Sequence, residues 1–150
     1  MPLASLSLLL ALVAGITMAF QGSLNAILGK AVGLLETTFV VHLVGTITVV
    51  LVLLLSRLGK NGLGQIGQAP WYAVLGGVLS VLIIYAVVAS ISKLGVATAT
   101  TAIIVGQVSA AVLIDHFGMF GLRQIPFTWW KLAGIALLAT GAKLMLNINH

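Results

Sequence analysis

Apolar stretches of about twenty residues alternate along the chain with short polar or glycine-containing segments. A hydrocarbon core about 30 Å thick needs about 20 apolar residues for one helical crossing, so each stretch is long enough to cross a bilayer as a helix. The pattern predicts five such spans, at residues 3–28, 36–56, 71–92, 96–115 and 128–146. We therefore expect an all-α, polytopic transmembrane bundle of five helices that forms a single transmembrane domain over residues 1–150.

The composition makes lipid the expected solvent of this chain. Of the 150 residues, 61% are hydrophobic and only 6% are charged. A water-soluble globule of this size needs more charged side chains to cover its surface. Seven Lys and Arg against two acids give a net charge of +5, but these bases are spread over different loops. We therefore expect no nucleic-acid partner.

The sequence offers no recognisable enzymatic or cofactor chemistry. Cysteine is absent, which excludes disulfides and thiolate metal sites. The histidines are scattered without metal-ligand spacing, and no paired carboxylates, activated nucleophile or phosphate loop stands out. We expect no cofactor, no metal and no enzymatic activity.

Charge near the helix ends gives the chain almost no preferred orientation. With five spans, the two sides of the membrane carry nearly equal numbers of bases: Arg57, Lys60, Arg123 and Lys131 on the side of the N-terminus, and Lys30, Lys93 and Lys143 on the other. Positive residues normally fix orientation, so this balance favours dual topology and an antiparallel dimer. The alternative is a parallel assembly. The first span lacks a preceding basic residue and a clear cleavage site, so we expect it to be retained and not removed as a signal peptide.

Uncharged polar side chains within the first two spans are candidate binding groups, because polar residues in lipid normally face the bundle interior. Gln21 and Asn25 lie four residues apart and share one face of the first span with Thr17. They either contact a polar substrate or join helices by hydrogen bonds. His42 in the second span could bind substrate or exchange a coupling proton near neutral pH. The preferred alternative is a neutral imidazole bonded to a carbonyl or hydroxyl group.

The fourth span combines small residues with two polar groups. We expect Gln107 to line a cavity. For Asp115 we favour a structural role, in which it orders the glycine-rich loop through Gly118 and Gly121 or pairs with Arg123. The alternative for Asp115 is a part in proton coupling.

Four further residues have both a structural and a functional interpretation. Glu36 opens the second span, where the helix macrodipole favours a carboxylate, but it is also a candidate for proton coupling. Tyr85 could hold a cation on its ring or simply pack. Gly134 and Gly141 lie seven residues apart, and we expect them to form a flat face for dimer packing.

Several local sequences are similar to those of a known family. They are Gln21 to Asn25, Pro70-Trp71 followed by Leu75-Gly76-Gly77, the pair Gly106-Gln107, and the segment from Asp115 to Gly121. Together they resemble the YdcZ-like branch of the drug/metabolite transporter superfamily, over essentially the whole chain. The resemblance implies a five-helix inner-membrane protein related to one half of the ten-helix EamA-like exporters. It also implies an antiparallel homodimer or a pair of homologous subunits.

The expected function is secondary transport of a small organic solute by alternating access between two inverted units, in the direction of efflux. Proton coupling through His42, Glu36 or Asp115 is a further hypothesis. The first span has no central acid, so the carboxylate exchange of the small multidrug resistance proteins is not expected. A passive channel and a structural subunit of a larger membrane complex are the alternatives.

Overall fold

The described part of the chain is mostly helical. The computed structural model describes residues 2–56 and 62–147. Its α-helices are α1 (Pro2–Val32), α2 (Leu34–Ser56), α3 (Gly76–Leu94), α4 (Val96–Phe117) and α5 (Trp129–Asn147). Three 3-10 helices lie in the connections: η1 (Leu63–Gln68), η2 (Trp71–Leu75) and η3 (Met119–Gly121). No strand occurs among the described residues, and the predicted all-α fold is confirmed.

Among the described residues, four helical segments are long and apolar enough to cross a membrane. They are Ser5–Val32, Leu34–Ser56, Trp71–Leu94 and Val96–Phe117. Many large apolar side chains on the helices are exposed, such as Leu8 and Leu55, which suits a protein whose surface faces hydrocarbon. The 19-residue α5 is not among these four segments, so the fifth crossing stays a prediction. Arg57 and Lys60, where we expected the second span to end, lie outside the described residues.

Contacts between residues divide the chain into two compact units, Met1–Ser92 and Lys93–His150. The first unit contains α1, α2, η1, η2 and nearly all of α3, and the second contains α4, η3 and α5.

The turn between α1 and α2 is shorter than the glycine-containing stretch 29–35 indicated. α1 continues to Val32, and only Gly33 leaves the helical conformation, with a φ of +100°. The Gly33 amide still donates to the Gly29 carbonyl (3.1 Å), and the Thr37 amide donates to the Gly33 carbonyl (3.1 Å). Glycine adopts positive φ without the steric cost that other residues meet. One glycine is therefore enough to reverse the chain.

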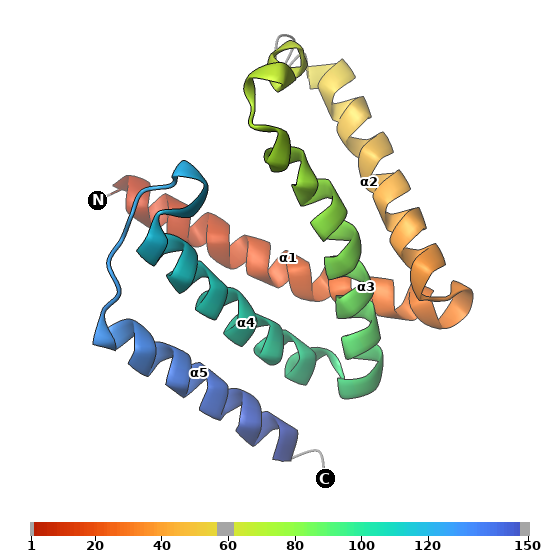
Figure 1. Cartoon of the computed structure of the whole chain (residues 1–150). Coiled ribbons are helices and arrows are strands. Elements are labelled where there is room, and N and C mark those ends of the chain that lie inside the picture. The colour runs from red at the N-terminus through yellow and green to blue at the C-terminus, as the bar shows by residue number, and fades with distance from the viewer. Residues whose placement is uncertain (1, 57–61, 148–150) are drawn as a thin grey trace. The chain divides into compact units, whose positions relative to one another are not determined.

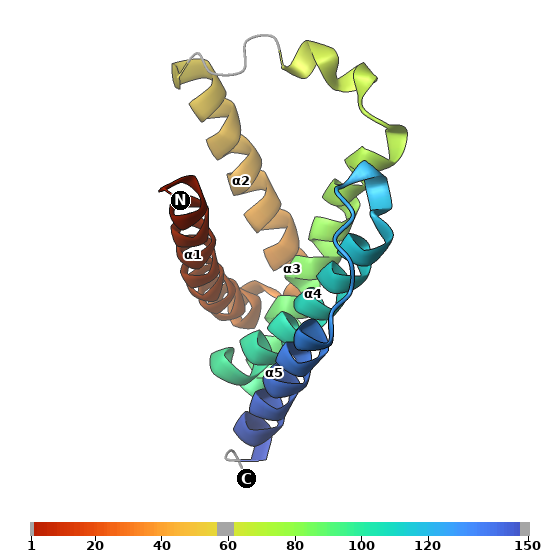
Figure 2. The ribbon, with the colours of Figure 1, turned by 90° about the vertical axis from the view of Figure 1, so that its left-hand side faces the viewer.

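Within the first unit, α2 and α3 run in opposite directions and approach each other near the end of α1. Figures 1 and 2 show that the two helices diverge toward the connection that contains η1 and η2. The aromatic start of the third span is the 3-10 helix η2, and regular α-helix begins only at Gly76. This arrangement leaves the contacts between α2 and α3 close to the α1–α2 turn.

Within the second unit, α4 and α5 pack side by side in opposite directions (Figure 1). The Thr101 hydroxyl on α4 donates to the Met145 sulfur on α5 over 3.0 Å. α4 ends at Phe117 and is capped by Gly118, which adopts a left-handed conformation (φ +58°) of the kind that closes many helix C-termini. From there the chain folds back, and the Ile125 amide donates to the Asp115 carbonyl over 2.8 Å.

Candidate functional site

Two glycines on one face of α1 allow α3 to pack closely against it. A Cβ added at Gly22 would lie 2.7 Å from Cδ1 of Ile91, and one added at Gly29 would lie 2.7 Å from Cγ1 of Val88. Val88 is completely buried. Small residues permit such close approach of membrane helices. The two glycines therefore mark the line along which α1 and α3 meet.

Asn25 lies on this same line, three residues after Gly22 and four before Gly29. Its side chain is only 8% exposed. Within the described chain no hydrogen bond engages its amide, and no polar atom of that side chain is completely enclosed. An amide without a partner is costly in an apolar environment. Among the described residues, the amide of Asn25 thus has donor and acceptor capacity that no hydrogen bond fills.

The residues predicted to form one polar face with Asn25 differ from it in exposure. Gln21 is exposed, and so is Thr17, whose hydroxyl donates to the Val13 carbonyl over 2.8 Å. Thr17 is therefore satisfied by its own helix.

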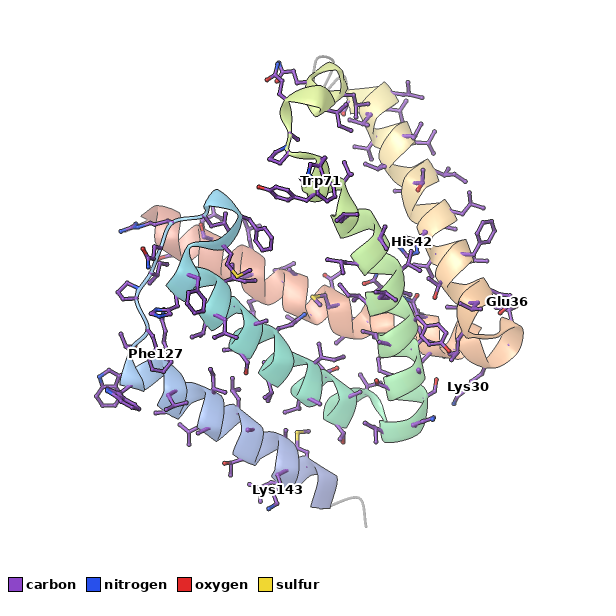
Figure 3. All side chains as sticks on the ribbon, in the orientation of Figure 1. Lys30, Glu36, His42, Trp71, Phe127 and Lys143 are labelled. Carbon is purple, nitrogen blue, oxygen red and sulfur yellow. The ribbon has the colours of Figure 1, made fainter. Side chains whose placement is uncertain are left out.

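His42 joins α2 to α3 within the first unit. Nδ1 lies 2.7 Å from the Thr38 carbonyl oxygen, and Nε2 lies 2.8 Å from the Ser80 hydroxyl oxygen. The Ser80 hydroxyl also lies 2.7 Å from the Gly77 carbonyl oxygen. Figure 3 shows the ring between the two helices. His42 and Ser80 are both half-buried.

Two apolar grooves flank this region on the surface of α2. One, with a volume of about 260 Å³, is lined by Leu35, Thr38, Phe39, His42 and Val81. The other, with a volume of about 530 Å³, is lined by Val32, Leu35, Glu36, Phe39 and Val40. Leu35 and Phe39 belong to both grooves.

Glu36 lies beside the α1–α2 turn. Its side chain is exposed and folds back over Gly33, so that a Cβ at position 33 would lie 2.5 Å from Oε2 of Glu36. Figure 3 shows Glu36 and Lys30 near this turn. A carboxylate in the first turn of α2 interacts favourably with the helix dipole.

The remaining polar candidates lie on α3 and α4. Tyr85 on α3 is 39% exposed, and Gln107 on α4 is exposed. Asp115 is half-buried, and its backbone carbonyl accepts hydrogen bonds from the Gly118 amide (3.3 Å) and the Ile125 amide (2.8 Å). Within the described chain, the carboxylate of Asp115 forms no ion pair with Arg123. The order of the loop after α4 therefore depends on the Asp115 backbone.

Gly134 and Gly141 on α5 both have open space where a Cβ would stand. Packing within the described residues does not require glycine at either position. Their role in dimer packing stays a prediction.

Ser80 is the functional candidate that sequence reasoning missed. A polar side chain within a predicted span is itself a signal, but a single serine in a helix usually bonds to its own backbone. Only the fold places Ser80 opposite His42, 38 residues earlier. The buried hydroxyls of Thr37 and Thr38, in contrast, donate to the carbonyls of Gly33 and Leu34 and are satisfied within α2.

The chemistry available in the first unit is binding and proton exchange. Among the described residues, no three His, Asp or Glu side chains gather so that they could hold a metal ion. Asn25 offers an amide that can both donate and accept, and His42 offers a titratable ring. Both lie within about 14 Å of Gly33 along their helices, because they are eight and nine residues from it.

Comparison with known proteins identifies the family of the chain. The model of the drug/metabolite transporter family described as "Putative inner membrane exporter, YdcZ" matches residues 6–144. No curated protein and no solved structure matches the chain significantly. The match covers nearly the whole chain, which confirms the resemblance carried by the local motifs and the expected location in the inner membrane. The chain therefore belongs to the YdcZ family of inner-membrane proteins.

Proposed function

We propose that the chain is one half of a secondary transporter that exports a small organic solute by alternating access. In such transporters the solute binds near the middle of the bilayer, between two units of opposite orientation. The family description supports export across the inner membrane. The nearly equal distribution of basic residues supports the opposite orientation of the two units, in an antiparallel homodimer or with a homologous subunit.

The observation that carries this proposal is the unpaired amide of Asn25. Its side chain is 92% buried on the face of α1 that meets α3, and no described residue forms a hydrogen bond with it. A subunit with only a structural role would gain nothing from an unsatisfied amide there, because an apolar residue would pack without the desolvation cost. A solute with a polar group can supply the missing hydrogen bonds.

The surroundings of Asn25 favour a solute whose bound group is uncharged. The neighbours that define its face are Gly22 and Gly29 on α1, with Val88 and Ile91 of α3 opposite these glycines. None of them carries a charge. An amide side chain pairs best with a group that both donates and accepts, such as a hydroxyl or another amide. A proton gradient is the driving force that we propose, with His42, Glu36 and Asp115 as the groups that could carry the proton.

Flux in proteoliposomes that contain only this chain tests the proposal. A panel of neutral polar metabolites and organic cations is supplied, with and without a pH gradient. We expect saturable flux of at least one neutral solute, and Asn25→Leu should reduce it by about tenfold or more because one or two hydrogen bonds are lost. Thr48→Val is the matched control, because the exposed Thr48 hydroxyl bonds only to the Val44 carbonyl.

The same measurement separates the alternatives. Flux that rises linearly with solute concentration would indicate a channel, and no flux for any solute would favour a structural subunit. Equal flux through the Asn25→Leu and Thr48→Val variants would remove Asn25 from the binding site.

A further inference from the structure

The hydrogen bonds around His42 constrain which ring nitrogen carries a proton. Nδ1 lies 2.7 Å from the Thr38 carbonyl oxygen. A carbonyl oxygen only accepts, so Nδ1 must carry hydrogen and donate. The Thr38 carbonyl oxygen can accept from both the helix backbone and the imidazole because a carbonyl oxygen has two lone pairs. The ring therefore keeps a proton on Nδ1, and Nε2 is the position that can gain or lose one.

When the ring is neutral, Nε2 has a free lone pair and must accept. The nearest donor is the Ser80 hydroxyl, 2.8 Å away. In this state Ser80 turns its hydrogen toward His42, and the Gly77 carbonyl receives no hydrogen bond from Ser80.

When the ring is positively charged, Nε2 carries hydrogen and donates to the Ser80 oxygen. The Ser80 hydrogen must then point elsewhere, and the Gly77 carbonyl oxygen lies 2.7 Å from the hydroxyl oxygen. A proton from hydronium forms the new N–H bond at Nε2 and leaves water behind, while the Ser80 hydroxyl rotates from Nε2 to Gly77. Every donor finds an acceptor in both states without movement of a heavier atom.

We propose that His42, Ser80 and the Gly77 carbonyl form a proton-binding site that joins α2 to α3, with Ser80 as the residue that positions either ring state. The bond between the helices changes from neutral to charge-assisted when the proton binds, and charge-assisted hydrogen bonds are the stronger ones. Protonation thus tightens the link between α2 and α3. Its use as the coupling step of export rests on the proposed function, whereas the proton site itself does not.

The setting of the ring suits this role. His42 is half-buried and lines the groove of about 260 Å³ beside α2. The titratable groups of the elements packed against it are Lys30 on α1, Glu36 on α2, and Tyr85 and Lys93 on α3. None of these forms a hydrogen bond or ion pair with His42. Among the described residues, the hydrogen-bond partners of the ring are therefore the Thr38 and Ser80 oxygens.

Nitrogen NMR of the ring tests the site directly. The chain has three histidines, so a His116→Gln, His150→Gln background leaves His42 as the sole imidazole. We expect the neutral ring to carry hydrogen on Nδ1, with Nε2 as acceptor, and acidification to add hydrogen at Nε2. A neutral ring that carries its hydrogen on Nε2 would overturn the proposal, and this experiment needs no substitution of Ser80.

Variants at Ser80 then test the positioning role. In Ser80→Ala the Nε2 resonance of the neutral ring should move toward that of an unbonded nitrogen, and Ser80→Thr should restore it because the hydroxyl returns. Ser109→Ala is the matched control, since Ser109 is a half-buried serine that bonds only to the Val105 carbonyl. An Nε2 resonance that is the same in Ser80→Ala and in Ser109→Ala would contradict the assignment.

Proteoliposome flux then tests the link to transport. We compare the ratio of the fluxes at two pH values between the variants and the wild-type chain. This ratio should be about tenfold smaller in Ser80→Ala, because a hydrogen bond to a charged group is lost, and unchanged in Ser109→Ala. If the NMR result holds but the wild-type chain moves no solute, the transport proposal fails and the proton site stands. If the Ser80→Ala variant keeps the full pH dependence, the proton site does not drive transport.

Discussion

Gly29 of α1 lies so close to Val88 of α3 that a Cβ at position 29 would be 2.7 Å from Cγ1 of Val88. Val88 is completely buried. Its side chain has a single torsion angle, χ1, which is restricted in a helix, so the side chain cannot move aside. The Gly22 position differs, because the atom that a Cβ would meet there is Cδ1 of Ile91, at the end of a longer side chain. The contact between α1 and α3 is therefore less tolerant at Gly29 than at Gly22.

We expect Gly29→Ala to destabilise the chain by about 1–3 kcal/mol, the usual cost of forcing an extra methyl group into a packed contact. Gly22→Ala should cost less because Ile91 can change rotamer. The measurement is thermal unfolding in detergent, followed by tryptophan fluorescence.

Gly15→Ala is the control for both variants. Gly15 also lies within α1, but no atom lies within 4 Å of the position of its Cβ. Alanine is the better helix former, so this variant should be as stable as the parent or slightly more stable. A Gly29→Ala chain that unfolds at the same temperature as Gly15→Ala would disprove the close contact.

Gly33 combines two constraints that a pair of variants can separate. Its φ of +100° is unfavourable for any residue with a side chain, and its Cβ would meet the Glu36 carboxylate at 2.5 Å. Gly95 has a φ of +79° but open space around its Cβ position. We expect Gly95→Ala to cost about 1–2 kcal/mol from the backbone alone, and Gly33→Ala to cost more, as measured by chemical unfolding.

The double variant Gly33→Ala, Glu36→Ala isolates the contribution of the carboxylate. Removal of the Glu36 side chain should bring the loss of stability back toward that of Gly95→Ala. Independent, additive effects of the two substitutions would show that the carboxylate does not lie against Gly33.

The hydrophobic pattern predicted the all-α fold because lipid leaves the backbone few alternatives to helices. The pattern located the ends of the helices less well. The glycine-containing stretch 29–35 predicted a turn of several residues, but Gly29 serves helix packing and only Gly33 reverses the chain. Composition cannot distinguish a glycine that turns the backbone from one that admits a neighbouring helix.

The candidate site could be predicted only in part for a related reason. A helical repeat places Gln21 and Asn25 on one face, but it does not say that Asn25 is buried and Gln21 exposed. The partner of His42 is Ser80, 38 residues later, so no local spacing could identify it. For Asp115 the side chain attracted attention, whereas the backbone carbonyl is the group that accepts from the loop.

The hydrogen bonds that order the loop after α4 give the next prediction. The Gln124 side chain donates to the His116 carbonyl over 2.8 Å, and the Phe127 amide donates to Nδ1 of His116 over 3.2 Å. We expect Gln124→Ala to speed hydrogen exchange at the Ile125 and Phe127 amides by about fivefold, the effect of one lost hydrogen bond of about 1 kcal/mol.

Asp115→Asn is the informative comparison for this loop. It keeps the backbone carbonyl that binds the Ile125 amide and removes only the charge. Exchange at the Ile125 amide should therefore match the parent chain. Faster exchange in Asp115→Asn than in Gln124→Ala would show that the Asp115 carboxylate orders the loop.

The open surface at Gly134 and Gly141 allows a test of the proposed dimer that spares the fold of a single chain. Because no described atom lies within 4 Å of either Cβ position, Gly141→Ile should leave the packing of α4 and α5 intact. If a second copy packs against this face, the added side chain should separate the copies and reduce the dimer fraction by about tenfold, since an overpacked contact costs 1–3 kcal/mol. Gly45→Ile on α2 is the control, because no described atom lies within 4 Å of the Cβ position of Gly45 either. Native mass spectrometry from detergent measures the dimer fraction, and an unchanged fraction in Gly141→Ile would place the dimer contact elsewhere.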